Sequence, residues 1–183
     1  MKRYRPLLLV LALLVLPFAV GGGLYAWGWR PDGGAHGELL DPARPLPALA
    51  DTAGRPLAAT AFNDHWSLVV AGSGPCDTAC RQWIIATRQV HVALYKQMSR
   101  VQRTWLTDQP APDTAPLLAI QPDLHTAVAA DDAGRAAFDL NQAGHRVYVI
   151  DPQGRIILRY PPDADPRGLL KDMERLLRYA WAG

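Results

Sequence analysis

The sequence predicts an α/β sandwich preceded by one N-terminal transmembrane helix. Three observations lead to this fold class: a charge-free apolar run at the N-terminus, alternating strand-like and helix-like patterns in the middle, and a hairpin pattern followed by an amphipathic helix at the end. The chain has 183 residues, of which 49% are hydrophobic. That is enough for one domain with its own core, so one domain is expected beyond the membrane segment.

The apolar run extends from Pro6 to Trp29 without a charged residue. About 20 apolar residues suffice to cross the hydrocarbon core as a helix. Basic residues precede the run and aromatic residues close it, a pattern typical of a helix whose N-terminus is cytoplasmic. We therefore expect a cytoplasmic segment at residues 1–5 and a transmembrane helix at residues 6–29. The chain would be a single-pass protein of a bacterial inner membrane, with its domain in the periplasm.

A cleaved signal peptide is the alternative interpretation of this segment. Residues 7–20 have the right length for the apolar region of such a peptide. No good Ala-x-Ala cleavage site follows, so the uncleaved anchor is preferred. The domain is exported in either case.

The charge balance argues against one class of partner. The formal charge is +2, but four basic residues belong to the N-terminal segment, at positions 2, 3, 5 and 30, and the remainder is mildly acidic. A nucleic-acid-binding domain would need clustered basic residues and a clearly basic balance. We therefore exclude nucleic acid as a partner.

Residues 30–45 are rich in Gly and Pro and are predicted to form an extended tether, so that the folded domain comprises residues 46–183. Within the domain, Trp66–Ala71 is a short apolar, β-branched segment typical of a buried strand. Gly and Pro at positions 72, 74 and 75 end this strand. A helix is expected to begin at or near Cys76.

Each residue of an α-helix is rotated by about 100° from the one before it, and at this spacing the side chains of the predicted helix fall on two sides. One side is a basic stripe, which a solvated surface explains most simply and which an acidic partner would also fit. The other side faces inward and carries both cysteines at its beginning. The basic stripe comprises Arg81, Arg88, Lys96, Arg100 and Arg103, and the inward side comprises Cys76, Cys80, Trp83, Thr87, Leu94 and Met98.

The remaining patterns complete the sandwich. They predict a strand at 101–107, a Pro-rich loop at 108–116, a weak strand at 127–130, a short helix at 133–139 capped by Asp132, hairpin strands at 147–150 and 156–160, and a last helix from Pro166. The order of strand, helix, strand, helix, hairpin and helix gives a thioredoxin-like sandwich.

Cys76 and Cys80 are the chemical feature of this domain. A thiol at the first turn of a helix faces unsatisfied N–H groups and the positive end of the helix dipole, and both favour its thiolate. A second cysteine one turn later can resolve a mixed disulfide or supply a second sulfur ligand to a metal. The alternative is a structural disulfide, but so short a loop would stabilise little, and a functional pair is preferred.

The region from Leu46 to Leu177 resembles the Sco/SenC family of thioredoxin-fold proteins. The best-matching motifs are Cys76-Asp-Thr-Ala-Cys80 and Val147-Tyr-Val-Ile-Asp-Pro-Gln-Gly-Arg155. The chain is also similar, at 37–40 and 80–106, to small single-pass transmembrane proteins found among bacterial cytochrome c oxidase assembly factors. The resemblance implies a role in maturing haem-copper oxidase, with an oxidase subunit or another assembly factor as partner.

Sco proteins bind copper through two cysteines and one histidine, or reduce the cysteines of the oxidase copper site. The resemblance therefore implies that Cys76 and Cys80 are catalytic thiols or copper ligands, with copper as the cofactor. His145 is the candidate third metal ligand, and the alternative is a surface histidine. The family's histidine position is held here by Ala143, on the same side of the strand as His145. The proline that usually follows each Sco cysteine is replaced here by Asp and Arg.

Three hypotheses follow for the function. The first is a membrane-anchored Sco-like factor for cytochrome c oxidase assembly that handles copper, or the thiols of its copper site, through Cys76 and Cys80. The second is a general periplasmic thiol-disulfide reductase, which would make the chain a thiol-disulfide oxidoreductase. The third is a non-catalytic assembly scaffold with a structural disulfide.

Overall fold

The computed structural model describes residues 5–26, 34–109, 115–129 and 131–179. The chain divides into two units, Met1–Gly34 and Ala35–Gly183. The first unit contains helix α1 (Arg5–Ala26), which has Pro17 inside it. Among the residues described, no helix combines the length and the hydropathy needed to cross a membrane.

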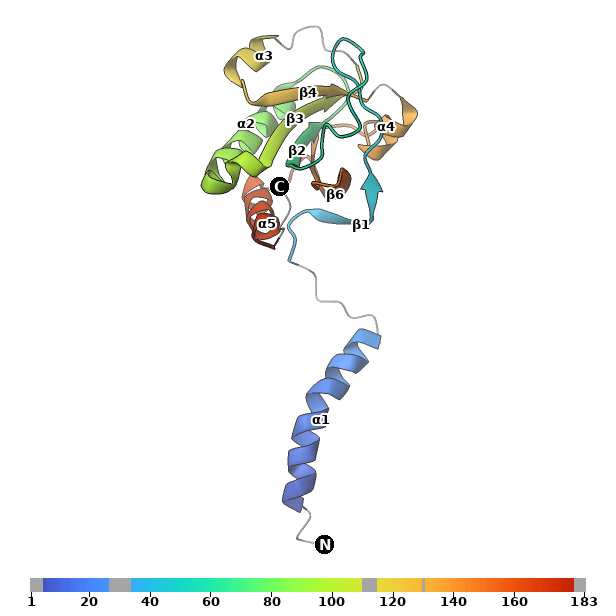
Figure 1. The fold of residues 1–183 in the computed structure, drawn as a ribbon, viewed down its shortest axis with the longest axis vertical. Helices are drawn as coiled ribbons and strands as arrows, with labels where there is room; N and C mark the ends of the chain where they lie inside the picture. The colour runs from blue at the N-terminus through green and yellow to red at the C-terminus, as the bar shows by residue number, and fades with distance from the viewer. Residues whose placement is uncertain (1–4, 27–33, 110–114, 130, 180–183) are drawn as a thin grey trace. The chain divides into compact units, whose positions relative to one another are not determined.

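The second unit is built on a six-stranded sheet, counted over the described residues, with the order β1-β6-β5-β2-β3-β4 (Figure 1). Strands β2, β3 and β4 run parallel, whereas β5, β6 and β1 continue the sheet in antiparallel pairs. The strands are β1 (Glu38–Pro45), β2 (Trp66–Ala71), β3 (Val101–Thr107), β4 (Leu124–Val128), β5 (Arg146–Ile150) and β6 (Arg155–Tyr160).

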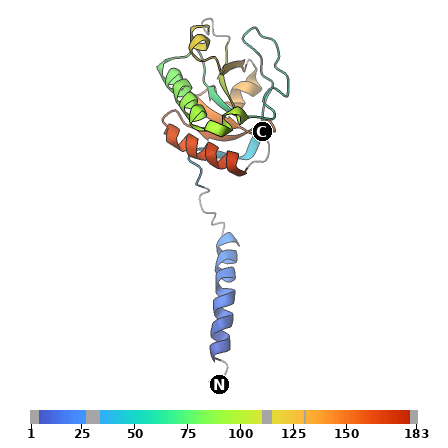
Figure 2. The ribbon, with the colours of Figure 1, turned by 60° about the vertical axis from the view of Figure 1, so that its left-hand side comes forward.

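Helices α2 (Thr78–Ala93) and α5 (Pro166–Tyr179) lie side by side on one face of the sheet (Figure 2). Buried apolar side chains of both helices and of the strands form the core on this face. A second core covers the other face, where the chain after α4 (Asp132–Ala137) packs. The 3₁₀-helix η2 (Tyr95–Arg100) follows α2, and the short helix α3 (Ala115–Ile120) precedes β4.

Strand β2 shows why both faces are covered. All six of its residues are buried, with Leu68 and Val70 in the core under α2 and α5, and Val69 and Ala71 in the other core. Alternate side chains of a strand point to opposite faces, so a strand with apolar side chains on both faces requires cover on both. The α/β sandwich is therefore confirmed.

The element boundaries agree well with the sequence analysis in the central strands, the hairpin and the last helix. The strands at 66–71 and 101–107 are confirmed, as are the hairpin and the helix from Pro166. The weak strand expected at 127–130 lies earlier, as β4 at Leu124–Val128. The short helix α4 has Asp131 as its N-cap instead of Asp132, because the Asp131 carboxylate accepts a hydrogen bond from Gly134 N–H at 2.7 Å.

The prediction that residues 30–45 form an extended tether is wrong for its second half, since Glu38–Pro45 is strand β1. This strand pairs with the outer edge of β6, with Glu38 opposite Arg159 and Pro45 opposite Arg155. Prolines are tolerated on an edge strand, where one side of the backbone has no partner strand. The Gly and Pro content was therefore not a sign of a tether in this segment. The folded unit begins at Ala35 instead of residue 46. Residues 30–33 of the predicted tether lie outside the described part of the chain.

The predicted basic stripe also needs correction, because Arg103 is fully buried. It lies in β3 and not on the helix, and its guanidinium donates to Asp123 Oδ2 at 2.8 Å and to the Ile84 carbonyl. Burial lowers the pKa of Arg103, and Asp123 partly opposes that effect. The α-helix ends at Ala93, and the 3₁₀ turn that follows changes the phase of the pattern. For the same reason Met98, predicted to face inward, is 41% exposed.

Candidate functional site

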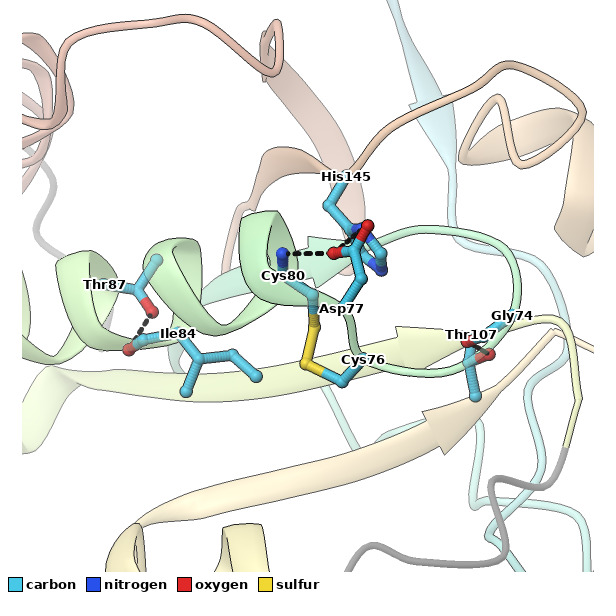
Figure 3. Close-up of a disulfide and its surroundings, with 8 residues drawn as sticks. All are labelled: Gly74, Cys76, Asp77, Cys80, Ile84, Thr87, Thr107 and His145. Atoms are coloured by element: carbon cyan, nitrogen blue, oxygen red, sulfur yellow. Dashed lines mark hydrogen bonds and ion pairs between the residues drawn. A yellow bond between two sulfur atoms is a disulfide. The ribbon is translucent and has the colours of Figure 1, made fainter.

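The two cysteines form a disulfide where β2 passes into α2 (Figure 3). Their Cα atoms are 5.1 Å apart, within the ordinary range for a disulfide. Cys80 is fully buried in the core under α2, whereas Cys76 is partly exposed in the loop before the helix. Cys76 is therefore the more accessible of the two cysteines to a thiol of another protein.

Asp77, between the two cysteines, caps the helix. Its Oδ1 accepts a hydrogen bond from the backbone N–H of Cys80 at 2.8 Å, and α2 begins at Thr78, slightly later than predicted. The first turn of a helix favours a nearby anion through its free N–H groups and its dipole. The Asp77 carboxylate accepts a hydrogen bond from one of those N–H groups and places a negative charge beside Cys76. These two influences on the Cys76 thiolate oppose each other.

The loop that presents Cys76 is held by the end of strand β3. The Thr107 hydroxyl donates to the Gly74 carbonyl at 3.1 Å, and Gly74 N–H donates to Asp108 at 2.9 Å. Ser73 donates to the same carboxylate at 2.7 Å. Burial raises the pKa of Asp108, but the hydrogen bonds from Ser73 and Gly74 outweigh it and leave the pKa below its usual value. Asp108 was not among the site residues predicted from the sequence, although loops that follow parallel strands commonly carry functional residues.

His145 lies next to Asp77, the residue that follows Cys76 (Figure 3). It is only 3% exposed, so the alternative of a surface histidine is wrong. Its ring fills the space where a side chain at Gly72 would lie, and its Nδ1 is 3.4 Å from Asp77 Oδ1. Within the described part of the chain, neither ring nitrogen makes a hydrogen bond. Burial lowers the pKa of His145, with the Asp77 charge partly opposing, so the folded protein favours the neutral ring.

The donor set of Cys76, Cys80 and His145 fits copper in its chemistry. The two thiolates are soft ligands of the kind that select Cu(I), imidazole also suits copper, and neither nitrogen of His145 is taken up by a hydrogen bond among the described residues. The sulfurs are bonded to each other in this structure. Over the residues described, no group of three or more His, Cys, Asp or Glu side chains is arranged to hold a metal ion. Metal ligation by this set therefore requires the reduced pair.

Residues 66–180 match the model of a protein family described as "transmembrane-like, thioredoxin-like, C-terminal domain". The chain belongs to this family. No curated protein matches the chain by sequence.

Solved structures of Sco proteins share the fold. Apo Sco1 from Thermus thermophilus is 22% identical, with a TM-score of 0.61 over 77% of this chain and 96% of that one. Yeast Sco1 with copper bound is 15% identical, with a TM-score of 0.57 over 73% and 87% of the two chains. BsSco, described as a member of the Sco family of cytochrome c oxidase assembly proteins with a disulfide switch, is 10% identical, with a TM-score of 0.56 over 79% and 98%. The predicted thioredoxin-like fold and the likeness to Sco proteins are confirmed.

Proposed function

We propose that this chain is a membrane-anchored, Sco-like factor for cytochrome c oxidase assembly that handles copper, or the thiols of the oxidase copper site, through Cys76 and Cys80. The observation that carries the proposal is a partly exposed and a buried cysteine on either side of Asp77, with the buried ring of His145 3.4 Å from the Asp77 carboxylate and, among the described residues, without a hydrogen bond. Relatives in fold include a Sco1 with copper bound and a named cytochrome c oxidase assembly protein. The partner would be an oxidase subunit or another assembly factor.

The burial of the two sulfurs supports one order of thiol chemistry. In the reduced protein, the Cys76 thiolate attacks a disulfide of the partner, forms a mixed disulfide and releases one partner thiolate. The Cys80 thiolate then attacks the Cys76 sulfur, closes the bond seen in this structure and releases the second partner thiolate. Two electrons pass to the partner, and an external dithiol must reduce the pair before the next cycle.

The same reduced pair supports copper handling. Cys76, Cys80 and His145 would hold Cu(I) as cargo, with Cys80 and His145 on the buried side and Cys76 toward the partner. Soft sulfur ligands suit this metal, and a partly exposed ligand allows the ion to pass to a second set of thiolates.

The proposal also includes the location of the chain in the cell. Residues 6–29 would anchor the chain in the lipid bilayer of a bacterial inner membrane, with residues 1–5 in the cytoplasm and the domain in the periplasm. The charge-free run and the family's description as transmembrane-like support this placement. Carbonate extraction of membranes, with protease added from the periplasmic side, tests it. Release by carbonate would exclude the anchor.

Copper titration of the full chain in detergent tests the metal role. We expect the reduced protein to bind one Cu(I), the oxidised protein none, and His145→Leu to bind at least about tenfold more weakly. Thr78→Ala, at an exposed position of the same helix turn, is the matched control and should bind normally. Failure of the reduced protein to bind copper would exclude the cargo role and leave the thiol role.

Replacement of both cysteines by Ser separates the remaining hypotheses in cells. The proposal expects loss of oxidase activity, restored by the unaltered chain. Intact oxidase activity together with impaired reduction of unrelated periplasmic disulfides would favour a general reductase, for which the accessible sulfur of Cys76 is sufficient. Intact activity in both assays would favour a scaffold with a structural disulfide.

A further inference from the structure

The outward side of α2, η2 and α5, here called the helical face, differs in charge from the rest of the domain. From residue 78 to residue 107 the chain has no acidic residue. Helix α5 adds four basic residues and one exposed acidic residue, Glu174, with Asp163 and Asp165 in the preceding loop. The rest of the chain must then be acidic, because the domain as a whole is close to neutral. The charge is therefore segregated.

The basic side chains of the helical face also differ from those elsewhere in the domain in their ion pairs. Five exposed basic side chains of the helical face have no ion pair among the described residues: Arg81, Lys96, Arg167, Lys171 and Arg178. Outside that face, five arginines each lie within ion-pair distance of a carboxylate: Arg44, Arg55, Arg135, Arg155 and Arg159. The helical face therefore presents positive charge that the domain itself does not neutralise.

Exposed apolar side chains are interleaved with these charges. Ile85 and Val92 lie on the outward side of α2, Tyr95 is 77% exposed in η2, and Tyr179 is 72% exposed at the end of α5. Basic residues combined with aromatic and aliphatic side chains are typical of surfaces that rest on the headgroup region of a bilayer. Protein interfaces also use aromatic side chains, so the choice between a bilayer and an acidic protein surface depends on where the helical face lies relative to the anchor.

The start of the folded unit is fixed to α5. The backbone N–H groups of His36 and Gly37 donate to Asp172 Oδ2 at 2.7 and 3.0 Å, and His36 packs flush against Gly168. If residues 6–29 are the membrane anchor, only residues 30–35 separate it from this point. Six extended residues reach at most about 20 Å. Helix α5 would therefore stay close to the membrane surface.

We infer that the helical face docks on anionic phospholipid headgroups of the membrane that holds the anchor. This inference rests on the membrane anchor of the proposed function. The short connection keeps α5 near the bilayer, the unpaired basic side chains meet the lipid phosphates, and the exposed tyrosines enter the headgroup region. Docking fixes the orientation of α2, and with it the direction in which Cys76 faces a membrane-embedded partner.

The test places the full chain in lipid nanodiscs that contain a gadolinium-chelating lipid and records paramagnetic broadening of amide NMR signals. Discs of phosphatidylcholine alone are compared with discs that include phosphatidylglycerol. We expect broadening concentrated in α2, η2 and α5 in the anionic discs, and its loss in neutral discs or in high salt. Lys171→Gln/Arg178→Gln should lose the broadening, whereas Arg55→Gln/Arg135→Gln, which removes the same charge elsewhere, should retain it.

Each other outcome has a defined meaning. A chain that does not stay with the discs overturns the anchor, and the docking with it. A chain that stays but shows the same broadening on all faces, or the same in neutral and anionic discs, overturns the docking alone. In that case an acidic protein surface becomes the candidate for the helical face. The copper and thiol assays above do not depend on either result.

Discussion

Asp172 and His145 are both buried polar side chains, with 4% and 3% exposure, yet their surroundings are opposite. The Asp172 carboxylate accepts hydrogen bonds from two backbone N–H groups, from Tyr160 and from the His36 ring. His145 has no hydrogen-bond partner among the described residues at either nitrogen. A buried polar group with all its partners stabilises a fold, whereas one without partners costs free energy. The difference indicates that Asp172 stabilises the domain, whereas His145 adds no hydrogen bond to the fold, in agreement with its proposed role as a copper ligand.

Two other buried side chains also lack a hydrogen-bond partner among the described residues, but they differ from His145. The indole nitrogens of Trp66 and Trp105 are also buried without a partner. Each belongs to a large ring that packs in the core under α2 and α5, so its apolar burial offsets the lost hydrogen bond. His145 is smaller, and neither of its nitrogens makes a hydrogen bond among the described residues, although Nδ1 lies 3.4 Å from the Asp77 carboxylate.

The largest effect should follow from removing the Asp172 carboxylate. Asp172→Ala leaves Tyr160 O–H and two backbone N–H groups without an acceptor and frees the start of the folded unit from α5. We expect a loss of roughly 3 kcal/mol or more in the free energy of unfolding. Chemical denaturation followed by circular dichroism measures it. Glu174→Ala, exposed on the same helix, is the control and should change stability by about 0.5 kcal/mol or less.

Acid should lower the stability that the hydrogen-bonded Asp172 carboxylate contributes. Burial raises the pKa of Asp172, but the hydrogen bonds from Tyr160, Gly37 and His36 outweigh it and hold the pKa below its ordinary value of 3.8. The unfolded carboxylate then binds its proton at higher pH than the folded one. The stability that Asp172 contributes is present above pH 3.8 and is lost as the pH falls toward the lower folded pKa.

Unfolding free energies of the unaltered chain and of Asp172→Asn, measured from neutral to acid pH, test this. The Asn variant should start less stable and lose less on acidification. Parallel pH profiles for the two proteins would show that Asp172 does not carry this charge-dependent stability.

Reduction of the disulfide should have a smaller effect. A bridge between residues four apart closes a very short loop, so its loss should lower the free energy of unfolding by about 2 kcal/mol or less. Denaturation midpoints with and without a reductant measure the change, and Cys76→Ala/Cys80→Ala should be insensitive to the reductant. A much larger loss would favour the structural disulfide of the scaffold hypothesis.

The smallest effect on stability is expected at His145. Leu has a comparable volume, and no hydrogen bond is lost when it replaces a ring without partners, so His145→Leu should change the free energy of unfolding by about 1 kcal/mol or less. Copper binding should nevertheless weaken at least about tenfold, as in the titration described above. A stability loss as large as that of Asp172→Ala would remove the contrast between the two sites.

Local sequence patterns predicted most of the sheet. The apolar run at 66–71 and the hairpin at 147–160 were correct because alternation and turn residues act over a few positions. The cysteine pair at a helix start was also found from local order. Asp172 could have been noticed, since it lies one turn from Leu169 on the inward side of an amphipathic helix.

The pair Cys76 and Cys80, its position between a buried strand and a helix, and the thioredoxin-like order of elements were determined by the sequence alone. Three features were decided only by the tertiary structure: β1 paired with β6, Arg103 buried under α2, and His145 enclosed beside Gly72 and Asp77. Each depends on a partner distant in the chain. Local periodicity specifies which residues can form an element, whereas burial and polar pairing are fixed only when separate elements meet.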